Sequence, residues 1–266
     1  CLKSFRKIKK IMNILDKIVI QKKNHFKYLE QKIKKIKLKK KIKPIFFQTI
    51  QNKLKKKQNA LIVEFKRFSP SVDSFKRIQN LQEVIKQYDK SQCSCISILT
   101  DRNFGGSLND ILIAKKITSK PIIRKDFIIN KYQVIESKIY GADAILLIAK
   151  ILTKKKLKNL CDFAVKIGLD VLIEIENKLE IKKIDKIKFK LIGINNRDLR
   201  EQKIDINKSI ELSEFLIDKI VVSESGITDR NIKKIKSKSN ISTFLIGGSI
   251  LNNTYKIGYI NKLYQA

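Results

Sequence analysis

The sequence predicts an α/β fold, a closed (β/α)8 barrel of the TIM type with an N-terminal helical extension. From residue 60 onward, short apolar segments alternate with amphipathic segments of helical spacing. The apolar segments expected to be strands are 60–65, 95–99, 121–123, 144–147, 170–175, 191–194, 220–223 and 244–246. Eight alternating units within about 200 residues favour a closed barrel over an open doubly wound sheet, and no GxGxxG motif follows the first strand.

The remaining segments are expected to be helices. Those within the barrel include 108–117, 131–140, 154–167, 229–237 and 249–263. Before them, apolar residues recur at helical spacing, beginning with Ile14, Leu15 and Ile18. We expect residues 12–58 to cover one end of the barrel and residues 59–266 to form the barrel, within a single domain. The basic run at 32–43 is interpreted as a solvated helix face or linker, and the alternative is a positive rim that attracts phosphorylated substrates.

The single methionine, Met12, opens this amphipathic pattern, whereas the chain begins with Cys1. Residues 1–11 are therefore interpreted as a non-native or upstream extension. An intact mass or N-terminal sequence showing that the native protein starts at Cys1 would contradict this hypothesis.

The chain is strongly basic. It has 59 Lys and Arg residues against 25 Asp and Glu residues, a formal net charge of +34. Such a charge is typical of proteins that bind nucleic acid or anionic membranes. However, lysine is spread throughout, aromatic residues do not interleave with it, and the chain is saturated with Ile and Asn and lacks Trp. We therefore favour AT-rich coding bias as the cause, and expect no specific nucleic-acid partner.

The four cysteines, Cys1, Cys93, Cys95 and Cys161, form no CxxC pair and have no histidine nearby. Neither a disulfide framework nor a metal site is expected, and the pattern suits a reducing cytoplasm. The longest apolar run, 142–149, is too short to span a bilayer, and no signal peptide is visible. The sequence leaves the oligomeric state open, with a monomer as the working expectation.

Charged and amide side chains follow the apolar segments at several predicted strand ends. In PIIRKDFII (121–129), the strand runs into Lys125. Other strands end in Glu64 and Lys66, in Glu174, in Asn195 and Arg197, and in Glu224 and Ser225. One such charge usually means a solvated turn. Five of them at the carboxyl ends, which share one mouth of a barrel, indicate an active site.

The residue types restrict the chemistry. The only histidine, His25, lies in the N-terminal segment and is interpreted as a surface residue. Acid–base catalysis therefore falls to Lys and Glu, whose pKa values burial and neighbouring charges can move toward neutrality. Two lysines at the mouth would depress each other's pKa, with the acids countering that effect. No metal-binding cluster and no Ser–His or Cys–His pair is visible in the sequence.

The last two strands precede glycine-containing turns. Ser225 and Gly226 come before one expected helix, and Gly247 and Gly248 before the next. Glycines let backbone N–H groups approach an anion, and helix N-termini favour negative charge. Many barrels hold phosphate at the loops after strands 7 and 8. The pair of turns therefore predicts a phosphate site.

In family order, the chain carries VEFKRFSPS (63–71), ILTDRNFGGS (98–107), PIIRKDFIINKYQ (121–133), GADAILLIA (141–149), VLIEIEN (171–177), IGINNRDL (192–199), VSESGI (222–227) and FLIGGSIL (244–251). These segments resemble the indole-3-glycerol phosphate synthase family of tryptophan biosynthesis. The resemblance extends from about residue 60 to residue 252, and MNILDKIV (12–19) is also similar to the start of that family.

The resemblance implies a carboxy-lyase without a cofactor that acts on 1-(2-carboxyphenylamino)-1-deoxyribulose 5-phosphate. Ring closure, decarboxylation and dehydration would give indole-3-glycerol phosphate. By motif, Lys125 would protonate the substrate carbonyl, and Glu174 would be the base or acid of dehydration. Lys66 and Glu64 would form a charged pair beside the anthranilate ring, with Lys66 assisting as an acid or holding the substrate carboxylate.

The resemblance also implies binding residues. Asn195 and Arg197 would position the substrate, with Glu224 and Ser225 in support. Phe104 and Phe127 would contact the aromatic ring. The phosphate would bind at Ser69, Gly226, Gly247 and Gly248.

Three positions depart from the family pattern, namely Asp73, Glu176 and Gly248, and none of them removes a proposed catalytic group. Two alternatives remain. A phosphoribosylanthranilate isomerase would need a Cys/Asp acid–base pair, and no cysteine follows a suitable strand. A barrel that binds nucleic acid without catalysis would show strongly salt-dependent binding and no turnover.

Overall fold

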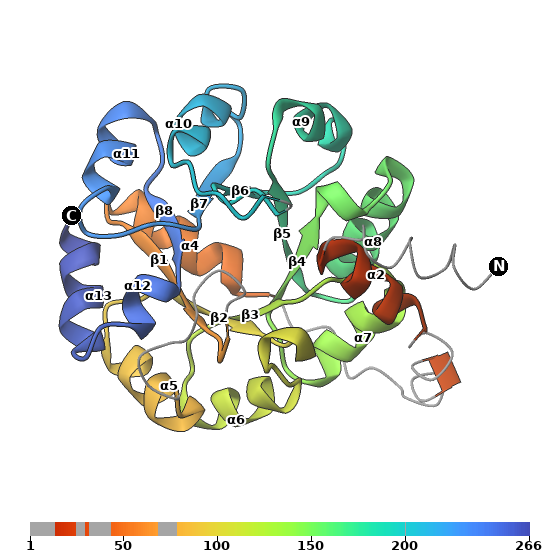
Figure 1. Cartoon of the computed structure of the whole chain (residues 1–266), viewed down its shortest axis with the longest axis horizontal. Coiled ribbons are helices and arrows are strands. Elements are labelled where there is room, and N and C mark those ends of the chain that lie inside the picture. The colour runs from red at the N-terminus through yellow and green to blue at the C-terminus, as the bar shows by residue number, and fades with distance from the viewer. Residues whose placement is uncertain (1–13, 25–29, 32–43, 69–78, 200) are drawn as a thin grey trace, which may run out of the picture.

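The computed structural model of the chain describes residues 14–24, 30–31, 44–68, 79–199 and 201–266. Eight parallel strands close into a barrel in chain order, because β8 pairs back with β1. The strands are β1 Ala60–Phe65, β2 Cys95–Leu99, β3 Ile122–Lys125, β4 Ala144–Ile148, β5 Asp170–Ile175, β6 Leu191–Asn195, β7 Ile220–Glu224 and β8 Thr243–Ile246. Helices surround this barrel in a ring (Figure 1). The predicted (β/α)8 barrel is confirmed.

The helices of the ring follow the strands in turn. They are α5 Leu81–Lys90, α6 Asn109–Ile117, α7 Lys131–Ile139, α8 Lys154–Lys166, α9 Lys178–Ile184, α10 Asn207–Ser213, α11 Ile232–Lys238, α12 Gly248–Leu251 and α13 Lys256–Gln265. Short 3-10 helices, η1 Arg102–Phe104 and η2 Ala149–Ile151, follow β2 and β4. Asparagine caps are frequent: the side chains of Asn80, Asn130 and Asn177 each accept an N–H from the first turn of the helix that follows.

One predicted helix is wrong in its extent. The segment 249–263 forms two helices, α12 and α13, separated by a turn at Asn253. The side chain of Asn253 accepts the backbone N–H of Tyr255 at 2.9 Å. Asparagine offers the backbone such a local alternative to the helical hydrogen bond, which interrupts the apolar pattern that predicted one helix.

The strands are buried on both faces, as expected for a parallel sheet covered by helices. Their outward side chains pack against the ring of helices, and their inward side chains fill the barrel. The inward set near the amino-terminal ends is apolar and includes Ile62, Cys95, Ile123, Ala144 and Leu172. Toward the carboxyl ends it becomes charged. The barrel interior is therefore an apolar core at the amino-terminal ends of the strands and a polar site at their carboxyl ends.

Two N-terminal helices, α2 Ile14–Asn24 and α4 Phe46–Lys55, lie at different ends of the barrel. On α4, Phe46 and Ile50 are fully buried against the apolar inward side chains. The backbone N–H of Phe47 donates to Asp170 at the start of β5. In contrast, α2 contributes to the cavity at the carboxyl ends of the strands. The interpretations of residues 1–11, of the basic run at 32–43 and of His25 lie outside the described residues.

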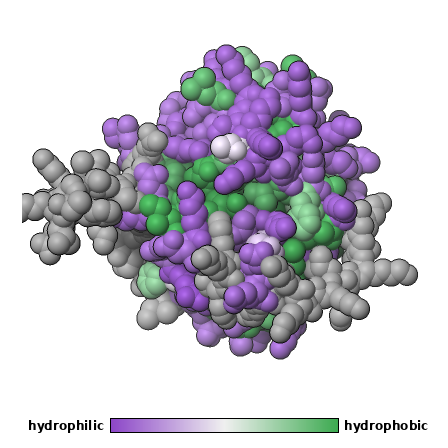
Figure 2. All heavy atoms as spheres, turned by 90° about the vertical axis from the view of Figure 1, so that its right-hand side faces the viewer, coloured by the Kyte–Doolittle hydropathy of each residue, from purple (hydrophilic) through white to green (hydrophobic). Residues whose placement is uncertain are grey.

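Among the described residues, no helix is both long enough and apolar enough to cross a membrane. Figure 2 shows one flank of the molecule, on which hydrophilic side chains lie above and below a band of hydrophobic ones. The hydrophilic residues are spread over this flank, as the distribution of lysine along the sequence predicts.

Candidate active site at the carboxyl ends of the strands

A cavity of about 400 Å³ opens at the carboxyl ends of the strands, and every strand contributes to its lining. It brings together thirteen of the fourteen predicted site residues: Glu64, Lys66, Phe104, Lys125, Phe127, Glu174, Asn195, Arg197, Glu224, Ser225, Gly226, Gly247 and Gly248. The fourteenth, Ser69, lies outside the described residues. The prediction that residues at the carboxyl ends of the strands share one mouth of the barrel therefore identified a single site, although these residues come from segments far apart in the sequence.

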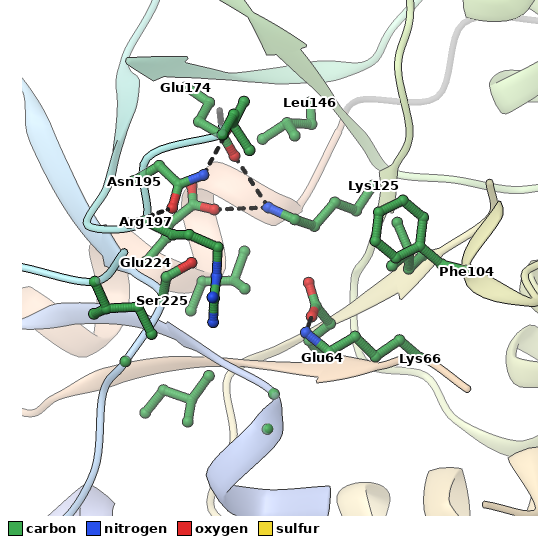
Figure 3. Close-up of a pocket in the computed structure, with 18 of the residues that line it drawn as sticks. Glu64, Lys66, Phe104, Lys125, Leu146, Glu174, Asn195, Arg197, Glu224 and Ser225 are labelled. Carbon is green, nitrogen blue, oxygen red and sulfur yellow. Dashed lines mark hydrogen bonds and ion pairs between the residues drawn. The ribbon is translucent and has the colours of Figure 1, made fainter. Parts of the chain in front are cut away.

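Lys125 lies at the centre of this site (Figure 3). Its Nζ atom is 2.8 Å from Glu224 Oε2 and 3.1 Å from Glu174 Oε2. Burial lowers the pKa of Lys125, but the carboxylates of Glu224, Glu174 and Glu64 together outweigh burial and hold the pKa well above its ordinary value. The acids therefore dominate the pKa of Lys125, in line with the expectation that they counter the effect of a second lysine at the mouth.

A second charged pair comes from the end of β1, where Lys66 Nζ lies 2.9 Å from Glu64 Oε1. Residues two apart in an extended segment point the same way, so both side chains reach the mouth. Burial raises the pKa of Glu64, but Lys66, Lys125 and Arg197 reverse that effect and leave it below its ordinary value. Glu64 is therefore a carboxylate that faces two ammonium groups.

Hydrogen bonds fix Glu174 from two sides. Its Oε2 atom accepts from Lys125, and its Oε1 atom accepts from Asn195 Nδ2 at 3.2 Å. The Oδ1 atom of Asn195 in turn accepts the backbone N–H of Arg197, and the Arg197 guanidinium donates to the carbonyl of Gln202 at 2.9 Å. Asn195 thus orients the carboxylate of Glu174 and the start of the loop that carries Arg197.

Glu224 is the most enclosed of the acids. Only 1% of its surface is exposed, and burial raises its pKa to about 7, with Lys125 opposing that shift. Its Oε1 atom has no hydrogen-bond partner among the described residues. Glu224 can therefore hold a proton near neutral pH, which a solvated glutamate would have released.

One wall of the cavity is apolar. The rings of Phe104 and Phe127 stack with their centroids 6.2 Å apart and an angle of 21° between their planes. Leu15 and Ile18 of α2 also line the cavity. Flat aromatic and aliphatic surfaces of this kind suit an aromatic ligand.

The opposite rim is formed by the two glycine turns. Ser225 and Gly226 have φ values of 67° and 74°, a left-handed conformation that is unusual for serine. Gly247 precedes α12, and a Cβ on Gly248 would meet no atom within 4 Å. The hydroxyl of Ser249 donates to the carbonyl of Ile227 at 2.9 Å and so ties the two turns together. The open backbone at this rim suits an anion.

Several lining residues were not predicted from the sequence, notably Leu15, Ile18, Leu199, Gln202 and Ile204. Helical periodicity placed Leu15 and Ile18 on a helix, but nothing in that pattern says which end of the barrel the helix meets. The other three belong to a loop that folds back after β6, where Arg197 and Ile204 form an isolated antiparallel bridge.

The described residues include no group of three or more His, Cys, Asp or Glu side chains placed to hold a metal ion. The described cysteines, Cys93, Cys95 and Cys161, are buried and do not line the cavity. The Cys/Asp pair that a phosphoribosylanthranilate isomerase would need is therefore missing from the described part of this site.

Comparisons with known proteins agree with these observations. The sequence profile of the family described as indole-3-glycerol phosphate synthase matches residues 15–263. An indole-3-glycerol phosphate synthase of Caldanaerobacter subterraneus subsp. tengcongensis is 41% identical over 215 residues, which cover 79% of this chain and 82% of that protein. One from Aquifex aeolicus is 41% identical over 197 residues, 73% of this chain and 76% of that protein.

A longer relative, the tryptophan biosynthesis protein TrpCF of Buchnera aphidicola subsp. Schizaphis graminum, is 39% identical over 86% of this chain but only 52% of its own length. Among solved structures, the tryptophan synthase subunit alpha from Legionella pneumophila str. Paris superposes with a TM-score of 0.64 over 84% of this chain and 98% of that one. At 11% identity, this likeness shows the fold alone. The profile and the curated relatives show that the chain belongs to the indole-3-glycerol phosphate synthase family, the carboxy-lyases of tryptophan biosynthesis.

Proposed function

We propose that this chain converts 1-(2-carboxyphenylamino)-1-deoxyribulose 5-phosphate to indole-3-glycerol phosphate, carbon dioxide and water by Lys/Glu acid–base catalysis. Membership of the family supports the overall reaction. The single observation that carries the catalytic proposal is Lys125, held between Glu174 and Glu224 where all eight strands converge. The apolar wall and the glycine rim lie on either side of it and match the two ends of the substrate.

The first step joins the aromatic ring to the sugar chain. The ring carbon that bears the carboxylate attacks C2 of the deoxyribulose, and the carbonyl oxygen at C2 takes a proton as the C–C bond forms. Lys125 donates this proton. Its raised pKa keeps it charged before the step, and the developing alkoxide is a stronger base than the carboxylates that surround the ammonium.

The second step restores the aromatic ring. The bond to the carboxylate breaks, carbon dioxide leaves, and the bonding electrons neutralise the cationic ring. Lys66, paired with Glu64 at 2.9 Å, holds the substrate carboxylate before it leaves or assists as an acid. In the third step, the hydroxyl on C2 takes a proton from Lys66 and departs as water, Glu174 removes a proton from C1 to complete the indole, and exchange with solvent returns both lysines and Glu174 to their starting protonation states.

The remaining residues bind and orient the substrate. Phe104 and Phe127 contact the aromatic ring, and Asn195 and Arg197 position the sugar chain, with Ser225 and Glu224 in support. The phosphate binds at the turns that contain Gly226, Gly247 and Gly248, together with Ser69. We place the reaction in the cytoplasm, where the free thiols of the described cysteines would stay reduced.

The test is turnover by the purified wild-type chain. We expect one carbon dioxide for each indole-3-glycerol phosphate, followed by indole absorbance and fluorescence, and the same rate after exhaustive treatment with a chelator. Folded protein that forms no product would contradict the proposed function. Phosphoribosylanthranilate as substrate and duplex DNA as ligand test the two alternatives in the same preparation, and we expect neither isomerisation nor binding near physiological salt.

A further inference from the structure

A glycine occupies an inward-facing position in the middle of β6. Gly193 pairs with Glu174 of β5 on one side and with Val222 of β7 on the other. It belongs to a regular strand and has no left-handed φ, so no turn requires a glycine there. Glycine weakens the interior of a strand, and its presence often marks a place where another group approaches the backbone closely.

The group that approaches Gly193 is the carboxylate of Glu224. A Cβ built on Gly193 would lie 2.0 Å from Glu224 Oε1 and 3.0 Å from its Cδ atom. Oε1 has no hydrogen-bond partner among the described residues, while Oε2 lies 2.8 Å from Lys125 Nζ. The carboxylate therefore rests with one oxygen against the bare backbone of β6, and its other oxygen holds the lysine.

We propose that Gly193 is a positioning residue, because its lack of a side chain leaves room for the Glu224 carboxylate at the bottom of the cavity, where the carboxylate binds Lys125. A second glycine makes room in the same way. A Cβ on Gly247 would lie 2.8 Å from Glu64 Oε1. Two of the three carboxylates around Lys125 thus occupy space that a glycine on a neighbouring strand or turn leaves free.

Gly193→Ala is an informative variant because it displaces a side chain rather than the backbone. The atoms that a methyl group would overlap belong to the flexible end of Glu224, and its other near neighbour, Leu172 Cδ1, is at an ordinary 3.6 Å. Glu224 would have to swing away from β6, which breaks its contact with Lys125. Lys125 keeps its contact with Glu174, so the barrel retains its fold while the lysine loses one of its two anchors.

The kinetic effect rests on the proposed function. We expect Gly193→Ala to lower kcat at least about tenfold, because a misplacement of about 1 Å in a catalytic group can cost that much or more. KM should change less than about threefold, because the phosphate turns and the aromatic wall are untouched. Glu224→Asp shortens the side chain and clears the new methyl group. It should therefore cost far less activity in the Gly193→Ala background than in the wild type.

A second readout does not depend on turnover. In protein labelled with ¹³C at the glutamate carboxyls, the Glu224 signal, assigned with Glu224→Gln, should titrate with a pKa near 7 in the wild type and with a different pKa in Gly193→Ala, because both the burial of the carboxylate and its contact with Lys125 change. Lys125, Glu174 and Glu64 face Glu224 from β3, β5 and β1 and are present in both proteins. If the Glu224 titration shifts in Gly193→Ala but the wild type shows no turnover, the proposed function is overturned and the role of Gly193 stands. An unchanged titration, or additive kinetic effects of the two substitutions, would overturn the role of Gly193.

Discussion

Three glutamates from three strands surround Lys125, and their environments differ. Lysine and arginine neighbours hold the pKa of Glu64 below its ordinary value despite burial. Glu224 is enclosed beneath the site, and burial raises its pKa to about 7. Because their pKa values differ, chemically identical side chains can provide both a proton donor and a proton acceptor in one site at neutral pH.

The raised pKa of Glu224 makes folding depend on pH. Its ordinary value is 4.5, so between pH 4.5 and about 7 the folded chain binds a proton that the unfolded chain releases. Stability from this group therefore falls as the pH rises through that window and is constant above it. Between pH 4.5 and pH 7.5, we expect the melting temperature of Glu224→Gln to fall by roughly 2–8 °C less than that of the wild type.

Thermal unfolding of both proteins across this pH range is the measurement, with exposed Glu83→Gln as the matched control. Glu176 also has a pKa raised by burial to about 7, so some dependence should persist in the variant. Curves for Glu224→Gln that parallel the wild type would show that Glu224 is ionised throughout.

At the scale of the elements, Lys22 ties α2 to the carboxyl ends of the strands. Lys22 Nζ lies 2.9 Å from Asp101 Oδ2 and 2.6 Å from Asp126 Oδ1, and both carboxylates are buried. Burial would raise the pKa of Asp126, but Arg124 and Lys22 hold it well below its usual range. The Oδ1 atom of Asp126 also accepts the backbone N–H of Phe127, so one carboxylate shapes the turn after β3 and binds α2.

Lys22→Met should therefore loosen α2 from the barrel. It removes a cation from two buried carboxylates, a loss of about 1–3 kcal/mol, so amide exchange in α2 should accelerate by roughly tenfold or more. KM should rise several-fold, because Leu15 and Ile18 on α2 form part of the cavity wall. Lys23→Met, on an exposed neighbour in the same helix, is the control. Equal exchange and equal KM in both variants would show that Lys22 does not anchor the helix.

The sequence predicted the individual elements well where the signal was local. Four strands end one or two residues later than predicted, β3 among them, because the charge at Lys125 does not interrupt backbone pairing with Leu99 of β2. The break between α12 and α13 depends on one asparagine side chain. The role of Gly193 could not be predicted, because it follows from the path of a side chain on the next strand.

At the scale of the whole molecule, the alternation of apolar strand segments with amphipathic helical segments was enough to predict the closed barrel. The polar residues that follow the strands then predicted where the site lies. What the sequence did not give is the placement of α2 and α4 at different ends, since amphipathic helices of similar composition fit either end. The +34 charge is likewise a property of the whole chain. The cavity lining contains four acidic residues, Glu64, Asp126, Glu174 and Glu224, beside Lys66, Lys125 and Arg197, so the site is not simply part of a basic surface.

The central claim is that Lys125 supplies the proton for ring closure. The most direct test is kcat for indole-3-glycerol phosphate formation by Lys125→Ala, beside Lys116→Ala, which removes an exposed lysine of α6. We expect Lys125→Ala to lose turnover by a factor of about a hundred or more while keeping its fold, and Lys116→Ala to match the wild type. Turnover by Lys125→Ala close to that of the wild type would contradict the account.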